Sequence, residues 1–309
     1  ALFTLGRYEE SGRAFTTYTV LFPTGADWAA AQEGVVRSAY EIGAEMMRHR
    51  DWAGARAAWS RFLEQHPLHA SARQTFFAIG ELYVLEAEGK PAEEAQPLLE
   101  KALRHWGDLA SRWPGTEEAS HALFASGNLL ETRLDRLDEA IAAYRRCIFG
   151  SWAGGAQASL ARMVEEDLTV ATPRAWRGGE AARVHLDLRN LEELTVEIFP
   201  LDLEVYFRNH HSHEGVGDLD LDLIAPAIQF TWKAPDYRRY APLARDLDLP
   251  VEGLGAWAVA VSGKNLRATT LVLRSDLDLL VKSSREELLV LAEDMHKLRE
   301  KGVCEMFLP

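Results

Sequence analysis

The period of the hydrophobic pattern changes near residue 165, and this change limits the chain to two unlike architectures. Just before it, Leu160 and Val164 lie four positions apart, on one face of an expected helix. After it, Val184 and Leu186 alternate with polar residues, as in a strand with one buried face. Helices followed by strands predict a multidomain α + β protein.

A recurring spacing in the helical half predicts an array of paired helices. In tetratricopeptide repeats the second helix of each pair carries a small residue. An aromatic residue four positions later packs against the next pair, and a Pro twelve positions after the small residue ends the helix. The spacing predicts a degenerate α-solenoid of four units. The sets that fit are Ser11, Phe15 and Pro23; Ala55, Trp59 and Pro67; Ala102, Trp106 and Pro114; and Ala140 and Tyr144 without the Pro.

Glycines mark the first helix of a pair, where neighbouring helices approach closely. Gly43 and Gly127 precede the small residues of the second and fourth units by twelve and thirteen positions. Gly80 precedes that of the third unit by 22 positions, and residues 88–91 with Pro97 mark an insertion there. Because the units are longer than the usual length of about 34 residues, we expect the extra length in loops or longer helices.

Such an array leaves one concave face whose side chains are free to bind a peptide or a neighbouring domain. The same helices would also serve as a spacer, and the residues leave both interpretations open. Five tryptophans resemble a ligand-stacking set, but Trp59 and Trp106 occupy the aromatic repeat position, so we expect these two in the core. The five are Trp28, Trp52, Trp59, Trp106 and Trp113.

The half after residue 165 predicts an all-β sandwich. About seven short runs alternate in hydrophobicity between turn residues, which is typical of an immunoglobulin-like sandwich of about 110 residues. Residues 256–261 are apolar at both parities and precede a turn at residues 262–265, so we expect a central hairpin. Residues 203–210 are the exception, because they fit a helix between strands.

Charge and cysteine content exclude several classes of protein. The net charge of −13 divides into −5 before residue 160 and −8 after it, so neither half carries the basic stripe of a nucleic-acid-binding protein. No apolar run approaches the ~18 residues that span a bilayer. Cys147 and Cys304 are the only cysteines, one in each half, which excludes a disulfide framework and a CxxC motif.

The cluster of His210, His211, His213 and Glu214 has the side chains that zinc prefers, but not the spacing. Adjacent histidines rarely reach one ion together, and no distant Cys or His pair completes the set. A solvated loop after a short helix is the favoured interpretation, and a metal-dependent enzyme that uses this cluster is the alternative. We therefore expect no metal and no cofactor.

Asp218, Asp220 and Asp222 begin like a calcium-binding loop. The sixth position is Leu223 and the twelfth is Gln229, where Gly and Glu belong. Their alternation with leucines predicts an extended edge with one acidic face instead.

Residues 263–265 contain the Gly-Lys pair of a phosphate-binding loop. However, Ala258 stands where the first Gly belongs, and Asn265 where Ser or Thr must hold magnesium, so we predict a hairpin turn. The sequence has no GxSxG, no GxGxxG that opens a helix, and no catalytic Cys with a plausible His partner. We expect a protein that is not an enzyme.

The second half contains a set of short stretches that are characteristic when they occur together. They are residues 160–163, 168–170, 189–191, 206–211, 218–226, 235–237, 268–272, 275–277 and 281–285. Over these stretches the chain resembles the first macroglobulin-type sandwich of large bacterial proteins in the alpha-2-macroglobulin family. The first half resembles the helical repeat region that precedes the sandwiches in some members.

This resemblance implies an extracytoplasmic protein, periplasmic or at the cell surface. Its full-length form would have many sandwiches, a bait segment and sometimes a thioester, and would trap proteases as an endopeptidase inhibitor. The chain contains no CxEQ thioester, because Cys304 is followed by Glu-Met-Phe, and no bait region fits. The resemblance therefore implies a non-catalytic scaffold segment, with proteases as partners of the full-length protein.

Together these inferences predict three parts. Residues 1–166 form a tetratricopeptide-like helical repeat domain, residues 167–284 a macroglobulin-type β-sandwich, and residues 285–309 the start of a second sandwich with an atypical tail. Because no initiator Met is present, we expect a piece of something longer, and the family resemblance implies that it is an N-terminal fragment. The alternative function is a free-standing tetratricopeptide-repeat adaptor, whose sandwich is an accessory binding module.

Overall fold

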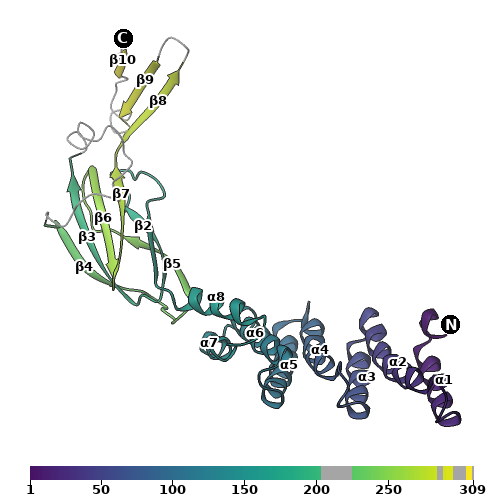
Figure 1. Cartoon of the computed structure of the whole chain (residues 1–309). Coiled ribbons are helices and arrows are strands. Elements are labelled where there is room, and N and C mark those ends of the chain that lie inside the picture. Colours follow the sequence, from purple (N-terminus) through teal and green to yellow (C-terminus); the bar gives the residue numbers. More distant parts are fainter. Residues whose placement is uncertain (203–224, 284–287, 295–303, 308–309) are drawn as a thin grey trace. The chain divides into compact units, whose positions relative to one another are not determined.

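The computed structural model describes residues 1–202, 225–283, 288–294 and 304–307, with helices first and strands after them (Figure 1). The chain divides into two compact units, Ala1–Met163 and Val164–Pro309, called here the helical unit and the β unit. Within the described residues, eight α-helices precede the first strand, and the sheets that follow are antiparallel. The predicted mixed α + β organisation is confirmed.

The helical unit consists of helices that pack in sequence order, after a 3-10 turn at Phe3–Leu5. They are α1 (Tyr8–Leu21), α2 (Trp28–Arg48), α3 (Trp52–Gln65), α4 (Ala72–Ala87), α5 (Ala92–Arg112), α6 (Glu117–Thr132), α7 (Leu137–Arg146) and α8 (Ala153–Val164). Each helix from α1 to α6 packs against the next one in sequence, and Figure 1 shows them following one another. α8 contacts α6, because Arg162 lies 2.5 Å from Glu131.

Local signals set the ends of several helices. Asp51 precedes α3 and Thr116 precedes α6, and each side chain accepts a hydrogen bond from a backbone N–H of the first turn, at 2.9 and 3.3 Å. Pro23, Pro67 and Pro114 lie two positions beyond the ends of α1, α3 and α5. Since Pro disfavours a helical residue before it, these three positions are helix stops, as predicted.

The aromatic rings of the repeat motif pack directly against three glycines. A Cβ atom added at the glycine would lie 2.2–2.5 Å from the ring, so no larger residue fits without a shift. Each ring packs on the first helix of its own pair, whereas we had expected contact with the next pair. Trp59 and Trp106 are 2% and 4% exposed, which confirms their place in the core. The pairs are Gly43 with Trp59, Gly80 with Trp106, and Gly127 with Tyr144.

The extra length of the third pair lies mainly in its second helix. α5 spans 21 residues, and Pro97, which we had assigned to an insertion, lies inside it. The connection before α5 is short and contains Gly89 at a φ of 73°, in the left-handed region that favours glycine. Gly80 therefore has the same role as Gly43, although it lies farther from the motif of its unit.

The β unit contains three antiparallel sheets in the described residues. Their strand orders are β1-β2-β5, β4-β3-β6-β7 and β10-β9-β8. The strands are β1 (Asp167–Ala171), β2 (Arg183–Arg189), β3 (Glu193–Leu201), β4 (Ile228–Lys233), β5 (Pro242–Asp248), β6 (Gly255–Gly263), β7 (Leu266–Arg274), β8 (Leu277–Ser283), β9 (Leu288–Asp294) and β10 (Cys304–Phe307).

The first two of these sheets share one hydrophobic core. Val184 and Leu186 of β2 belong to the same buried cluster as Val196 and Ile198 of β3 and Val261 of β6, and all five are fully buried. Alternate residues of β2 are exposed or half-buried, as the period of two predicts. Burial of each such side chain contributes about 1.5–3 kcal/mol. This core holds seven of the strands in two layers.

Two expectations about the strands were wrong. The hairpin of β6 and β7 is not central, because β7 is the last strand of its sheet among the described strands. β8, which we had placed in the sandwich, pairs instead with β9, and residues 304–307 of the predicted tail pair with β9 as β10. Side-chain alternation alone does not say which strands are neighbours. The helix expected at residues 203–210 lies outside the described residues.

Candidate functional site

Most of the candidate residues from the sequence fall where the structure gives no description. His210, His211, His213 and Glu214 lie outside the described residues, as do Asp218, Asp220 and Asp222. In the part of the chain that is described, no group of three or more His, Cys, Asp or Glu side chains could hold a metal ion. No helix among these residues is long and apolar enough to cross a membrane.

Lys264 lies in the turn between β6 and β7, at a φ of 52°. Its ammonium group donates hydrogen bonds to the Glu166 carboxylate at 2.6 Å and to the Asn190 carbonyl at 3.0 Å. Both partners are residues of the β unit, so these two hydrogen bonds hold the Lys264 side chain against that unit. The predicted hairpin turn is confirmed.

The helical unit contains a groove that the sequence did not single out. Side chains from α2, α3, α4 and α6 and from the segment before α8 enclose a cavity of about 410 Å³. A second cavity, of about 300 Å³, adjoins it and shares His121 and Trp152. We call the larger cavity the aromatic groove. Most of its lining comes from α2, α4 and α6, the first helices of the three pairs, with Trp59 added from α3.

Five rings are arranged in succession along the two cavities. His121 lies between Phe77 and Trp152, with ring centroids 3.9 and 4.0 Å away and interplanar angles of 23° and 1°. Trp152 in turn stacks on Phe124 at 5.1 Å, and Phe77 on Trp106 at 5.6 Å. Offset stacking of this kind adds about 0.5–1.5 kcal/mol for each pair. The five rings, called here the aromatic stack, come from α4, α5 and α6 and from the segment before α8.

His121 is neutral near pH 7, because burial lowers its pKa more than the nearby Glu117 carboxylate raises it. A neutral imidazole has a flat, weakly solvated face, which suits its position between Phe77 and Trp152. The aromatic stack therefore presents uncharged ring surface, on which an apolar or aromatic side chain can lie.

Three carboxylates lie along the aromatic groove and differ in their partners. Hydrogen bonds from the Ser151 side chain and from its backbone N–H, the latter at 2.8 and 3.0 Å, lower the pKa of the Glu117 carboxyl. Glu118 lies 3.7 Å from Arg73. Glu81 has neither an ion pair nor a hydrogen bond among the described residues, and desolvation raises its pKa. Glu81 as a whole residue is exposed, so its carboxyl group is partly desolvated by its neighbours but still accessible to solvent.

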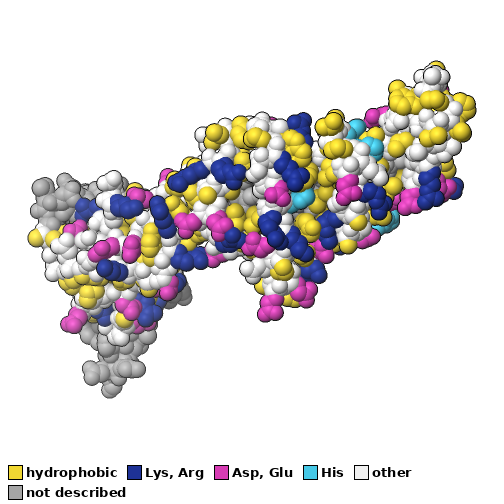
Figure 2. All heavy atoms as spheres, turned by 90° about the horizontal axis from the view of Figure 1, so that it is seen from below, with side chains coloured by type: hydrophobic (Ala, Val, Ile, Leu, Met, Phe, Trp, Pro, Cys, Tyr) yellow, Lys and Arg dark blue, Asp and Glu magenta, His cyan; other side chains and the backbone are white. Residues whose placement is uncertain are grey.

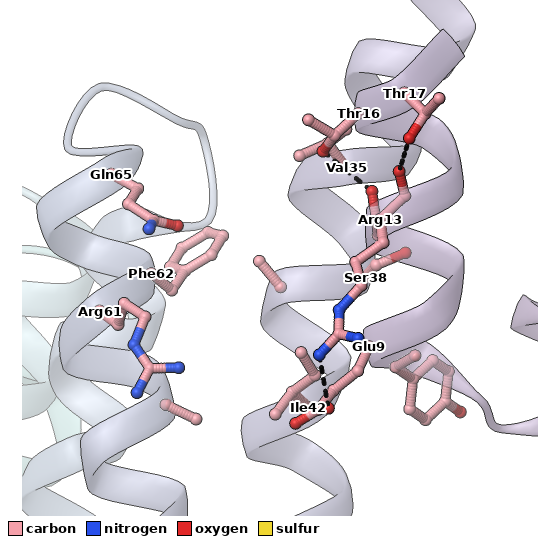
Figure 3. A pocket seen from close by; sticks show the side chains of 14 residues that line it. Glu9, Arg13, Thr16, Thr17, Val35, Ser38, Ile42, Arg61, Phe62 and Gln65 are labelled. Carbon is pink, nitrogen blue, oxygen red and sulfur yellow. Dashed lines mark hydrogen bonds and ion pairs between the residues drawn. The ribbon is translucent and has the colours of Figure 1, made fainter. Parts of the chain in front are cut away.

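A larger cavity, of about 710 Å³, lies between α1, α2 and α3 (Figure 3). Arg61 and Phe62 of α3 face α1 across it, while Arg13 pairs with Glu9 at 3.7 Å. The hydroxyl of Thr16 donates to a backbone carbonyl of its own helix at 2.9 Å. Its polar groups are thus mostly engaged, and its charges are mixed. It offers fewer stacked rings than the aromatic groove.

Large hydrophobic side chains gather at the end of the helical unit that α1 forms (Figure 2). Val20 is 71% exposed, Leu21 65% and Phe22 53%. Basic and acidic side chains are interspersed along the face shown in the same figure. No pocket among those found in the described residues is lined by these three side chains, so the aromatic groove remains the best candidate.

The sequence held a signal for the aromatic groove that we missed. Tyr40, Phe77 and Phe124 each lie three positions before a first-helix glycine, and each lines the groove or the adjoining cavity. His121 and Trp152 have no such signal. Trp152 lies beyond the last repeat motif and reaches the stack only because α8 folds back onto α6.

No protein-family model and no curated protein matches this sequence. Among solved structures, one that is similar over part of its length is native alpha-2-macroglobulin from Escherichia coli, spanning domains MG0-NIE-MG1. The two chains are 12% identical with a TM-score of 0.34, and the match covers 43% of this chain. It spans 46% of the length of the other chain.

Proposed function

We propose that this chain is a non-catalytic protein-interaction segment whose helical unit binds a peptide along the aromatic groove. The observation that carries the proposal is the stacking of His121 between Phe77 and Trp152 on a surface open to two adjoining cavities. Aromatic side chains that line cavities of this size are typical of sites for apolar and aromatic side chains.

The groove suits an extended segment better than a compact ligand. The cavities of about 410 and 300 Å³ share His121 and Trp152, so one chain segment can occupy both. Gln74 and Asn128 add side-chain amides, which can bond to a peptide backbone. In this proposal the helices are a degenerate solenoid of tetratricopeptide type, which binds peptides on its concave face.

We further propose that the chain is a scaffold segment of a bacterial alpha-2-macroglobulin-like protein. The support is the set of characteristic stretches in the sequence and the two antiparallel sheets around one core, which fit a macroglobulin-type sandwich. An extracytoplasmic location and the trapping of proteases would belong to the full-length protein. The test is the reading frame beyond Pro309, where further sandwiches and a CxEQ motif are expected.

The alternative is a free-standing tetratricopeptide-repeat adaptor. The observation in its favour is that residues of the helical unit alone line the aromatic groove. A reading frame that continues without further sandwiches would support the adaptor and remove the family proposal. Peptide binding is common to both, so it is tested separately.

The binding test uses the full chain and an immobilised library of random ten-residue peptides. Trp152→Ser removes the outer ring of the aromatic stack, so we expect the captured protein to fall about tenfold, as for a hot-spot residue. Phe22→Ser is the matched control, because Phe22 is an exposed ring outside the groove, and capture should stay unchanged. Equal capture of the wild type and the Trp152→Ser variant would refute the proposed function.

A further inference from the structure

The charge of the aromatic groove has one sign. Its lining includes Glu81, Glu117 and Glu118, and no Lys or Arg among the described residues. His121 does not offset this charge, because it is neutral near pH 7. Elsewhere on the face shown in Figure 2, basic and acidic side chains are interspersed. The groove is therefore more acidic than that surface, although it is walled by rings.

The uncompensated part of this charge is at Glu81. Glu118 is offset by Arg73, and Glu117 by the Ser151 N–H, whereas Glu81 has no such partner in the described part of the chain. Glu81 lies one turn beyond Phe77 on α4, so its carboxylate extends from the face that carries the stack. A crowded carboxylate without a partner is stabilised by an incoming cation.

The adjoining cavity differs in charge. Arg133 belongs to its lining, whereas the three carboxylates line the aromatic groove. A ligand with a cationic part should therefore bind in one orientation, with that part in the aromatic groove, near α2 and α4, and away from Arg133. Apolar side chains can lie along the aromatic stack between them.

We propose that the aromatic groove takes a positively charged peptide segment, in which one Lys or Arg side chain pairs with Glu81. The aliphatic part of that side chain lies against the rings, and its charged head is near both a carboxylate and aromatic faces. An Arg guanidinium fits best, because it pairs with a carboxylate through two hydrogen bonds and also stacks on rings. This inference rests on the proposed peptide binding and adds the class of the peptide.

The probe is a set of three immobilised libraries of random ten-residue peptides, with Arg, norleucine or Glu fixed at the central position. We expect the full-length chain to be retained about tenfold more by the Arg library than by the norleucine library, which corresponds to about 1.4 kcal/mol. The Glu library should retain least. The preference for Arg should decrease in 0.5 M salt, because screening weakens a partly exposed ion pair.

The deciding variant is Glu81→Gln, which removes the charge and keeps the shape. It should retain the Arg and norleucine libraries equally, because the advantage of the Arg library depends on the charge of Glu81. The matched control is Glu88→Gln, which changes an exposed carboxylate just beyond α4 and outside the groove. It should keep the full preference for Arg. Circular dichroism confirms that both variants are folded.

The outcomes separate this inference from the proposed function. If Glu81→Gln keeps the preference for Arg, or if the wild type prefers the norleucine or Glu library, this inference is overturned while peptide binding stands. If no library retains the wild type, or if Trp152→Ser is retained as well as the wild type, the proposed function fails and this inference fails with it. Retention that is competed by free spermine but not by an Arg-containing peptide would identify a small polyamine as the ligand, and would also overturn the inference.

Discussion

At the scale of single residues, the helical unit repeats one arrangement three times. A ring of the second helix lies on a glycine of the first, and the residue three positions before that glycine is aromatic. In two pairs the indole N–H also donates to the backbone carbonyl of that aromatic residue, Trp59 to Tyr40 at 3.0 Å and Trp106 to Phe77 at 3.1 Å. The buried core and the exposed groove are thus linked through the same few residues.

Gly80→Ala tests this arrangement. The added Cβ would lie 2.2 Å from Nε1 of Trp106, so the ring must move and the Phe77 wall with it. Overpacking of this kind costs about 1–3 kcal/mol, which exceeds the gain in helix propensity of about 1 kcal/mol. We expect a lower midpoint of urea unfolding, measured by circular dichroism.

The matched control is Gly107→Ala in α5, where an added Cβ meets no atom within 4 Å. There the gain in helix propensity is not opposed, so the free energy of unfolding should rise by about 0.5–1 kcal/mol. Stabilisation of both variants would contradict the close packing of Trp106 against Gly80.

Two histidines should make the units respond oppositely to pH. Burial lowers the pKa of His105, whose Nε2 lies 2.8 Å from the Phe76 carbonyl oxygen, so the helical unit loses stability as pH falls below about 6.5 and the unfolded chain takes up the proton. A hydrogen bond to Asp246 at 2.7 Å raises the pKa of His185 in the β unit. The contribution of His185 is full below about 6.5 and is lost as pH rises through its higher folded value.

The check is a ¹H–¹³C NMR titration of the histidine side chains in the intact chain. The resonance of His105 should titrate below the ordinary range, and that of His185 above it. Asp246→Asn should return the pKa of His185 toward the ordinary value and leave His105 unchanged. Coincident titrations of the two histidines would contradict the assignment of their surroundings.

At the scale of elements, a buried arginine joins the segment between β1 and β2 to the end of β7. Arg274 is 7% exposed and donates hydrogen bonds to three backbone carbonyls, those of Val251 at 2.6 Å, Gly178 at 2.5 Å and Glu180 at 3.0 Å. Asp276 accepts a hydrogen bond from the Gly178 N–H at 2.8 Å. A long connection with a single backbone bridge, between Trp176 and Arg274, is thus held largely by side chains.

Arg274→Met should loosen this connection. The change leaves the three carbonyls without that donor, and each unsatisfied buried group costs about 1–3 kcal/mol. We expect the N–H of Trp176, which bonds to the Leu273 carbonyl at 2.8 Å, to exchange with deuterium faster than in the wild type. Arg267→Met is the control on the same strand, where the exposed pair with Glu197 at 3.5 Å contributes at most about 1 kcal/mol. Unchanged exchange at Trp176 in the Arg274→Met variant would refute the role of Arg274.

At the scale of the whole molecule, the chain is two compact units joined within a few residues. α8 ends at Val164 and β1 begins at Asp167. Each unit has its own buried residues, Ala55 and Trp59 among those of the first and Val184 and Val196 among those of the second. Separate cores of this kind are expected to fold separately.

We therefore expect residues 1–164, expressed alone, to unfold cooperatively with a helical circular dichroism spectrum. The urea midpoint should match that of the helical transition in the intact chain within experimental error, because no part of its core is removed. A fragment that is unfolded, or whose midpoint is much lower, would show that the helical unit depends on the β unit.

Particular residues show how much of the fold could be predicted from the sequence. The motif at Ala55, Trp59 and Pro67 identified a helix, its buried ring and its end, because each of these depends on spacing along one helix. Alternation at Val184 and Leu186 identified a strand and its buried face. The place of β7 as the last described strand of its sheet and the pairing of β8 with β9 were not predicted, because alternation is the same whichever strand lies beside it.

What the sequence by itself determined is local: the helices and their stops, the change to strands, and which side of each element is buried. Only the tertiary structure decided that each ring seats in its own pair, that Trp152 and Phe77 meet on opposite faces of His121, and that Glu81 is left without a partner beside them. The reason is physical. Periodicity follows from the geometry of one element, whereas a groove is made by side chains from several elements, and their distances depend on how the helices pack.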